Sequence, residues 1–99
     1  MVKHIILWKL KDEIPDRAAA AAEAKVRLES LMGRIPGLVS ITVHTEALPS
    51  SNADMMLDSL FTDADALAGY QTNPLHVEAA TYVRSVVEQR LCLDFEVEG

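Results

Sequence analysis

Apolar residues recur along the chain at two different spacings, and these spacings separate strands from helices. Alternating or continuous apolar runs of strand length occupy four segments: 2–10, 38–45, 54–61 and 91–97. Apolar residues three and four positions apart, as on one face of an amphipathic helix, occupy three others: 16–32, 62–70 and 74–87. Residues 47–53, which are rich in serine and also contain proline and asparagine, are expected to form a loop.

Capping residues mark the ends of the first two helices. Asp16 can accept a hydrogen bond from a backbone amide in the first turn of the first helix. Gly33 suits the left-handed conformation that ends a helix, so this helix should end near Met32. Thr62 and Asp65 have the spacing of a capping box, which predicts the start of the second helix.

The break between the second and third helices gathers side chains that can perform chemistry. Asn73 is a good N-cap and Pro74 a good first helical residue, so His76 should lie in the first turn of a new helix. The positive end of the helix dipole disfavours imidazolium, and we expect His76 to be neutral near physiological pH and able to accept a proton. Tyr70, at the end of the preceding helix, offers a hydroxyl to the same space. Simple capping is the alternative interpretation of this segment.

The first strand places a second histidine on an apolar face. By the two-residue period of a strand, His4 shares a face with Ile6 and Trp8. His4 is therefore either a pocket residue near His76 or a core histidine that bonds to His76 or to the backbone. Trp8 is either a core residue or a wall of the same pocket.

The order of the elements predicts the fold class. Strand, helix, strand, strand, helix, helix, strand is the order of an α+β, ferredoxin-like domain spanning residues 1–99, with helices on one face of a four-stranded antiparallel sheet. The first and third strands also carry Ile5, Leu7, Met56 and Leu60 on the face that no helix covers. Because soluble monomers rarely expose such a face, we predict a homodimer whose two sheets form a closed α+β barrel.

Composition excludes several classes of partner. A formal net charge of −6 and a pI near 4.9 argue against nucleic acid or an anionic membrane as a partner. A single cysteine and an N-terminal apolar run that is too short for a signal peptide lead us to expect a cytoplasmic protein. The sequence has no cysteine spacing typical of zinc or haem attachment and no glycine-rich phosphate loop.

Three further polar residues are assigned more ordinary roles. Cys92 is expected to be an inert buried thiol, and His44, on the more polar face of its strand, a surface or interface residue. Asp94 is expected to pair with Arg84 or Arg90, with a cation ligand as the alternative.

Several short motifs are spread over essentially the whole chain: Val2-Lys3-His4-Ile5-Ile6, Lys9-Leu10-Lys11-Asp12-Glu13, Ile35-Pro36-Gly37, Tyr70 to His76, and Asp94-Phe95. Together they resemble the stress-responsive dimeric A/B barrel (Dabb) family. The resemblance implies ferredoxin-like protomers that pair into a barrel, in agreement with the argument from the sheet faces.

The resemblance also implies a chemistry. The family includes polyketide cyclases of the olivetolic acid cyclase type, which close a linear poly-β-keto thioester by aldol chemistry without a cofactor. It implies His76 and Tyr70 as the catalytic pair and His4 as a supporting residue, with no metal. The substrate-binding wall would consist of Ile6, Trp8, Val26 and Ala79.

Departures from the family pattern keep three functions open. Asn73 stands where the family often has histidine, and small residues at Ala22, Val26 and Ala79 replace the aromatic pocket residues of the plant cyclase. A similar pocket would therefore differ in shape. The first hypothesis is a cofactor-independent cyclase or proton-transfer enzyme acting on a keto-type substrate. The second is a non-catalytic stress-response protein that binds a small apolar ligand, and the third is a haem-degrading monooxygenase.

Overall fold

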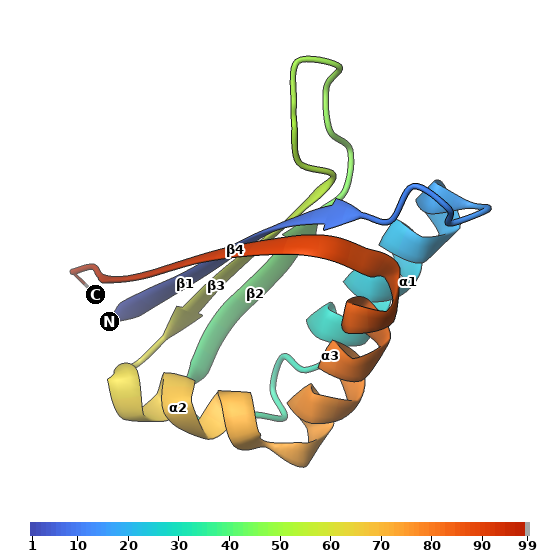
Figure 1. Cartoon of the computed structure of the whole chain (residues 1–99). Coiled ribbons are helices and arrows are strands. Elements are labelled where there is room, and N and C mark those ends of the chain that lie inside the picture. Colours follow the sequence, from blue (N-terminus) through green and yellow to red (C-terminus); the bar gives the residue numbers. More distant parts are fainter. Residues whose placement is uncertain (99) are drawn as a thin grey trace.

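One four-stranded sheet with three helices beneath it makes up the fold (Figure 1). The computed structural model describes residues 1–98, in the order β1 (Val2–Leu10), α1 (Arg17–Glu29), β2 (Leu38–His44), β3 (Met55–Phe61), α2 (Ala64–Thr72), α3 (Pro74–Val86) and β4 (Val87–Glu96). The strands lie in the order β2-β3-β1-β4, and neighbours are antiparallel. The predicted ferredoxin-like α+β fold, with its helices on one face, is therefore confirmed.

Two of the three predicted N-terminal helix caps are confirmed. The Asp16 carboxylate accepts a hydrogen bond from the Ala19 amide at 3.0 Å, and the Asn73 side chain accepts one from the Leu75 amide at 2.9 Å. The prediction of Thr62 as the cap of α2 is wrong, because Asp63 accepts the bond from the Ala66 amide at 2.8 Å. Thr62 instead lies at the end of the sheet, where its backbone amide donates a hydrogen bond to the Gly37 carbonyl at 2.9 Å.

Two element boundaries also differ from the prediction. Helix α1 ends at Glu29 rather than near Met32, because the chain tightens there into turns in which the Met32 amide bonds to the Glu29 carbonyl at 3.2 Å. Strand β4 begins at Val87, directly after α3, because the long β1 strand offers it partners as far as Leu10. The polar residues 88–90 conceal this start in the sequence pattern.

The core lies between the sheet and the helices. Every second residue of β1 on that side is buried, and β3 contributes Leu57 and Phe61, which are 1% and 0% exposed. Helix α1 faces this layer with its alanines, of which Ala24 is 0% exposed. Small side chains allow this helix to pack closely against the sheet. The described residues contain no helix long and apolar enough to cross a membrane.

The other side of the sheet, here called the open face, carries an apolar surface that no helix covers. Strand pairing sets Leu93 opposite Ile5 and Leu91 opposite Leu7, so the apolar side chains of neighbouring strands adjoin. Its apolar members are Ile5, Leu7, Met56, Leu60, Leu91, Leu93 and Phe95. Lys3 and Asp58 on this face form an ion pair at 2.6 Å.

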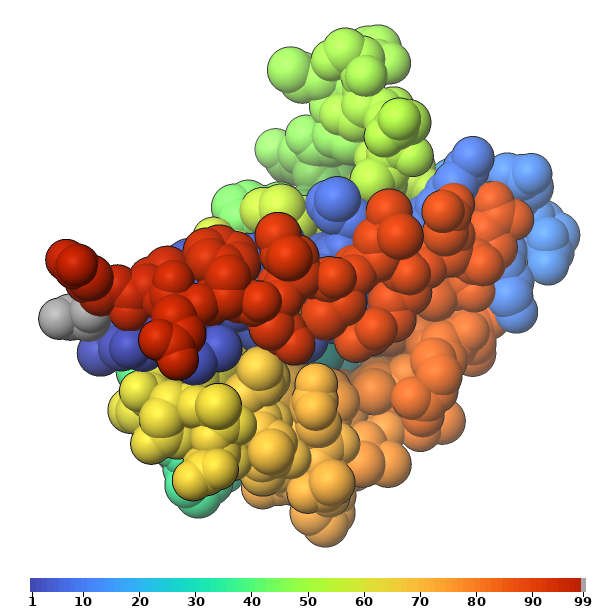
Figure 2. Space-filling model, turned by 60° about the vertical axis from the view of Figure 1, so that its left-hand side comes forward, coloured from blue at the N-terminus to red at the C-terminus, as the bar shows by residue number. Residues whose placement is uncertain are grey.

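The loop between β2 and β3, here called the arm (residues 45–54), stands away from the sheet on the side opposite the helices (Figures 1 and 2). The predicted loop at 47–53 is thus confirmed. Leu48 in the arm is 71% exposed. Most of this apolar side chain is therefore not packed within the protomer.

Candidate functional site

Tyr70 occupies the centre of the helix-covered side. Helix α2 holds it 1% exposed, with its ring centroid 4.9 Å from that of Phe61. Close approach of α2 to the start of β2 depends on Gly37, whose φ is +80°. A Cβ at this glycine would lie 2.4 Å from the Cβ of Ala66, so a larger residue would push α2 and Tyr70 outward.

His76 folds back over Tyr70 from the first turn of α3. The two ring centroids are 4.1 Å apart, and the planes are inclined by 39°. The Nδ1 atom of His76 lies 3.3 Å from the Gln71 carbonyl oxygen. Because a carbonyl can only accept, we assign the hydrogen of the neutral ring to Nδ1, which leaves the lone pair of Nε2 free to accept a proton.

Both groups have perturbed acidities with identifiable causes. Burial lowers the pKa of His76 below its ordinary value, and the hydrogen bond to the Gln71 carbonyl opposes this in part. Smaller electrostatic effects of His4, Arg84 and Arg90 act in the same direction as burial. Burial raises the pKa of Tyr70 far above its ordinary value. His76 is thus held neutral as predicted, although burial is the largest cause and not the helix dipole proposed from the sequence. Tyr70 remains a hydrogen-bond donor.

The Tyr70 hydroxyl has no hydrogen-bond partner among the described residues, although it is fully buried. Leaving a buried hydroxyl unpaired typically costs about 1–3 kcal/mol. Natural proteins keep such groups rarely, and one that lines a cavity is available to a ligand or a water molecule. This hydroxyl is the strongest local indication of a binding site.

His4 lies beside Tyr70 and is fastened to the sheet edge. It is 1% exposed, with its ring centroid 6.2 Å from that of Tyr70, and its Nδ1 pairs with the Asp94 carboxylate. The partner of His4 is therefore neither His76 nor the backbone. The prediction that Asp94 pairs with an arginine is also wrong, because Asp94 lies directly opposite His4 in the β1–β4 register.

A cavity of about 400 Å³ lies beside Tyr70 and His76, between the sheet and α3. Figure 2 shows β4 running along the sheet edge above α2 and α3, on the side where this cavity lies. Its lining is Ile6, Trp8, Leu28, Leu57, Tyr70, His76, Ala80, Val83, Arg84, Val87, Glu88, Gln89 and Arg90. His4 supports the wall from behind and does not line the cavity.

Two of the predicted wall residues lie elsewhere. Val26 is 64% exposed on α1, outside the lining. Ala79 is buried next to α1 and borders a separate shallow hollow. The stripe of α3 that faces the cavity runs through His76, Ala80 and Val83, at helical spacings of four and three, and Ala79 is off this stripe.

The sequence pattern did not indicate the two arginines that line the cavity, Arg84 and Arg90. Helical spacing from His76 leads to Val83, and Arg84 follows it at the rim. Arg90 could not be placed, because β4 was expected to begin after it. With the true register, Arg90 lies directly opposite Trp8 on β1.

Cys92 is exposed on the edge strand β4, in which residues 88–96 are all exposed, so its predicted burial is wrong. Its Sγ lies 3.7 Å from His4 Nδ1 and 3.5 Å from an Asp94 oxygen. Partial burial and the Asp94 charge raise the pKa of the thiol and keep it protonated. Among residues 1–98, His4, Cys92 and Asp94 offer ligand atoms close enough together for a metal ion.

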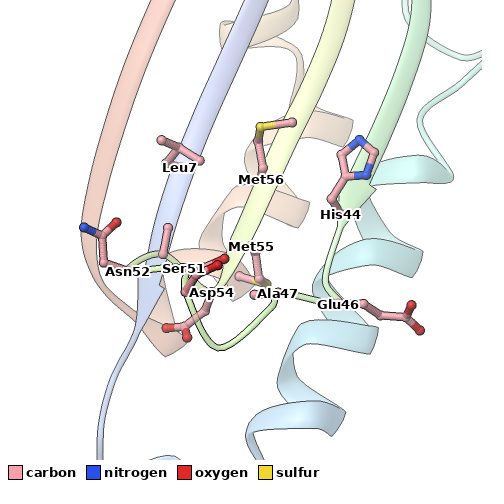
Figure 3. A pocket seen from close by; sticks show the side chains of 11 residues that line it. Leu7, His44, Glu46, Ala47, Ser51, Asn52, Asp54, Met55 and Met56 are labelled. Carbon is pink, nitrogen blue, oxygen red and sulfur yellow. The ribbon is translucent and has the colours of Figure 1, made fainter.

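A second cavity of about 400 Å³ lies on the open face, beneath the arm. Figure 3 shows Leu7, Met56 and His44 projecting from three strands toward this space, with Ser51, Asn52 and Asp54 of the arm along its border. His44 is exposed there, consistent with the surface or interface role expected of it. The described residues place no hydrogen-bonded acid and base pair in this cavity.

Comparisons with known proteins agree with this architecture. A crystal structure of a dimeric ferredoxin-like protein of unknown function from Bacteroides fragilis is 32% identical, with a TM-score of 0.90 over 97% of this chain and 95% of that one. A hydroxynitrile lyase from Passiflora edulis is 15% identical, with a TM-score of 0.81 over 98% and 93% of the two chains. A cofactor-independent oxygenase from Streptomyces nogalater is 17% identical, with a TM-score of 0.76 over 99% and 93%.

The two enzymes share only the fold with this chain, since identities this low carry no assignment of activity. A search of curated proteins found no match. The family model described as the stress responsive A/B barrel domain, in contrast, matches residues 2–97. The chain therefore belongs to the stress responsive A/B barrel (Dabb) domain family.

Proposed function

We propose that the protein is a homodimer whose protomers each bind a small keto-type molecule in the cavity beside Tyr70, and that His76 transfers a proton to or from the bound molecule without a cofactor. One observation carries the proposal: a buried hydroxyl without a partner adjoins a neutral imidazole that has one nitrogen free, in the wall of a mainly apolar cavity. A donor for a carbonyl oxygen and a base for the neighbouring C–H are the groups that enolisation requires.

The proton transfer follows from these two groups. The Nε2 lone pair of His76 takes a proton from the carbon next to the carbonyl. The electron pair of the broken C–H bond then forms the carbon–carbon double bond of the enolate. The carbonyl electron pair moves to oxygen, where the Tyr70 hydroxyl donates a hydrogen bond to the developing charge. Burial strengthens this bond, because few water molecules compete with it. Return of the proton from His76 to carbon completes an exchange. In a cyclisation, the enolate carbon instead attacks a second carbonyl of the same molecule, and the oxygen of that carbonyl takes the proton back from His76.

His4 and Asp94 act as positioning residues in this proposal. Asp94 accepts from His4 Nδ1, and the buried ring of His4 stands edge-on beside the ring of Tyr70. The Ser59 hydroxyl donates to the His4 carbonyl at 2.8 Å and fixes the backbone at the same point. In the proposal, these bonds restrict the position of the Tyr70 ring, which lines the cavity.

The homodimer would form through the open face. Its apolar side chains include Leu93, which is 64% exposed, and Leu91, which is 59% exposed. The Lys3–Asp58 ion pair neutralises two charges that would otherwise enter the contact alone. An interface of about 800 Å² per partner is typical of a stable complex. The Bacteroides fragilis relative, which is dimeric, supports this arrangement.

A proton-exchange assay tests the catalytic proposal without knowledge of the natural substrate. An apolar monoketone, 2-octanone, is incubated with the protein in D₂O, and the loss of its α-protons is followed by NMR. We expect His76→Ala to reduce the protein-dependent exchange rate by about 10²–10⁴-fold, which is the usual contribution of a general base. Tyr70→Phe should cost less, because it removes one hydrogen bond and keeps the ring.

The controls separate loss of chemistry from loss of structure. Circular dichroism and sedimentation must show that both variants are folded and have the same oligomeric state as the original protein. If the original protein and His76→Ala exchange the α-protons equally fast while both bind the ketone, the catalytic proposal is wrong. That result would favour a protein that binds a small ligand without turnover, in which His76 holds the turn against Tyr70.

A further inference from the structure

Two arginines stand at the rim of the cavity. Arg84 comes from the last turn of α3, and Arg90 comes from β4, opposite Trp8 in the neighbouring strand. Both are close enough to His76 to act on its pKa, and Arg90 also acts on the pKa of Tyr70. The positive charge of these arginines therefore affects His76 and Tyr70, the two residues to which the chemistry is assigned.

Neither arginine is neutralised by a carboxylate among residues 1–98. Four other cations are engaged in ion pairs at 2.6 to 3.1 Å: Lys3 with Asp58, Arg17 with Asp54, Lys25 with Glu29, and Arg27 with Glu23. Lys9, Lys11 and Arg34 also have no ion pair among the described residues, but none of these three lines this cavity. The cavity lining includes one acidic residue, Glu88, against the two guanidinium groups. In a chain with a net charge of −6, the rim of this cavity is thus locally positive.

We propose that the ligand of this cavity is a monocarboxylate with an apolar body, whose carboxylate binds at Arg84 and Arg90. The inference rests on the proposed function, because it takes the same cavity as the binding site. Guanidinium groups bind carboxylates through charge-assisted, often bidentate, hydrogen bonds. Two guanidinium groups offset by one carboxylate leave a single positive charge, which matches a monoanion.

The remainder of the lining fits the rest of such a molecule. Ile6, Trp8 and Leu57 offer an apolar wall from the sheet, and Val83 offers one from α3. The Tyr70 hydroxyl and His76 Nε2 supply one donor and one acceptor for a polar group within the body. A keto acid with an aliphatic chain combines all three features: a charged end, an apolar body and a carbonyl.

Trp8 makes the proposal directly measurable. It is the single tryptophan of the sequence and is 4% exposed in the cavity wall, so its fluorescence reports on the occupancy of this cavity. The dimeric protein is titrated with octanoate and, separately, with octanamide, which has the same chain and no charge. We expect octanoate to bind about tenfold more tightly, because charge-assisted hydrogen bonds are stronger than neutral ones.

Three variants with the same change of charge complete the experiment. Arg90→Gln should bring the affinity for octanoate down to that for octanamide. Arg34→Gln removes the same charge from an arginine that borders a different hollow, and it should retain the preference for octanoate. Persistence of the preference in Arg90→Gln and in Arg84→Gln would overturn the assignment of the carboxylate to this rim.

The titrations also distinguish this inference from the proposed function. Equal affinities for octanoate and octanamide would refute the monocarboxylate while leaving the cavity as a small-molecule site. If neither compound changes the fluorescence of Trp8, both the monocarboxylate and the cavity as a binding site for apolar chains are refuted.

Discussion

The two faces of the sheet differ in what they bury and in what they leave unpaired. Ile6 and Leu7 are neighbours in β1, yet Ile6 is 4% exposed beneath the helices and Leu7 is 39% exposed on the open face. The helix-covered side combines apolar packing with buried polar groups at His4, Ser59 and Tyr70. The open face has apolar side chains around one ion pair. Buried polar groups serve recognition and chemistry, whereas an uncovered apolar surface serves association.

The largest expected effect comes from placing the same charge on each face in turn. Ile6→Glu puts a carboxylate into the core without a partner, and an uncompensated buried charge costs about 3–5 kcal/mol. We expect the variant to lose a large part of its stability, because many domains have total stabilities of only about 5–15 kcal/mol. Circular dichroism and urea titration measure this loss.

Leu7→Glu introduces the same charge one residue further along, where the isolated protomer leaves it in water. We expect it to split the homodimer, because the two-fold axis would bring two such charges into one apolar contact. Sedimentation at micromolar concentration should show a folded monomer. A stable dimer of Leu7→Glu would mean that the protein associates through another surface, and an unfolded chain would mean that the protomer depends on the dimer.

The same two faces explain what the sequence could predict. The period of two in β1 places His4, Ile6 and Trp8 on one side and Ile5 and Leu7 on the other, and both sets lie where the period predicted. Local capping chemistry predicted the break at Asn73 and Pro74 in the same way. These signals depend on residues that are close in the chain.

The errors concern relations between distant segments. The pairing of His4 with Asp94 follows from the register of β1 with β4, and no local pattern encodes this register. Arg90 was missed for the same reason, because polar residues of an edge strand resemble a loop. Val26 was assigned to the pocket through family resemblance, and the orientation of α1 instead turns it toward solvent.

A smaller effect is expected from removing the unpaired hydroxyl on the helix-covered side. Tyr70→Phe keeps the ring among Phe61, His4 and His76 and deletes an oxygen that has no partner in the described residues. Its removal should stabilise the ligand-free protein by about 1 kcal/mol, since a buried unsatisfied group costs about 1–3 kcal/mol. Thermal unfolding should show a melting temperature that is higher by a few degrees, together with weaker ketone binding. A lower melting temperature would indicate that the hydroxyl is already satisfied, for example by water.

The smallest effect concerns the pH dependence of stability and isolates His76 from the rest of the molecule. Its pKa in the folded protein lies below the ordinary 6.5, chiefly because burial disfavours the charged ring. Between the two values the unfolded chain binds more protons than the folded one, so the free energy of unfolding rises with pH up to about 6.5 and then levels off for this group. Conversely, stability should fall as the pH is lowered through this range. The remaining ionisable groups are common to the original protein and to His76→Gln. The difference between the two stability profiles therefore reports on His76 and on its electrostatic coupling to neighbouring charges. We expect His76→Gln to show the shallower slope between pH 5 and about 6.5 in urea titrations. Parallel profiles would mean that the ring is as accessible to water in the folded state as in the unfolded state. Burial would then not be what keeps Nε2 unprotonated and able to act as a base.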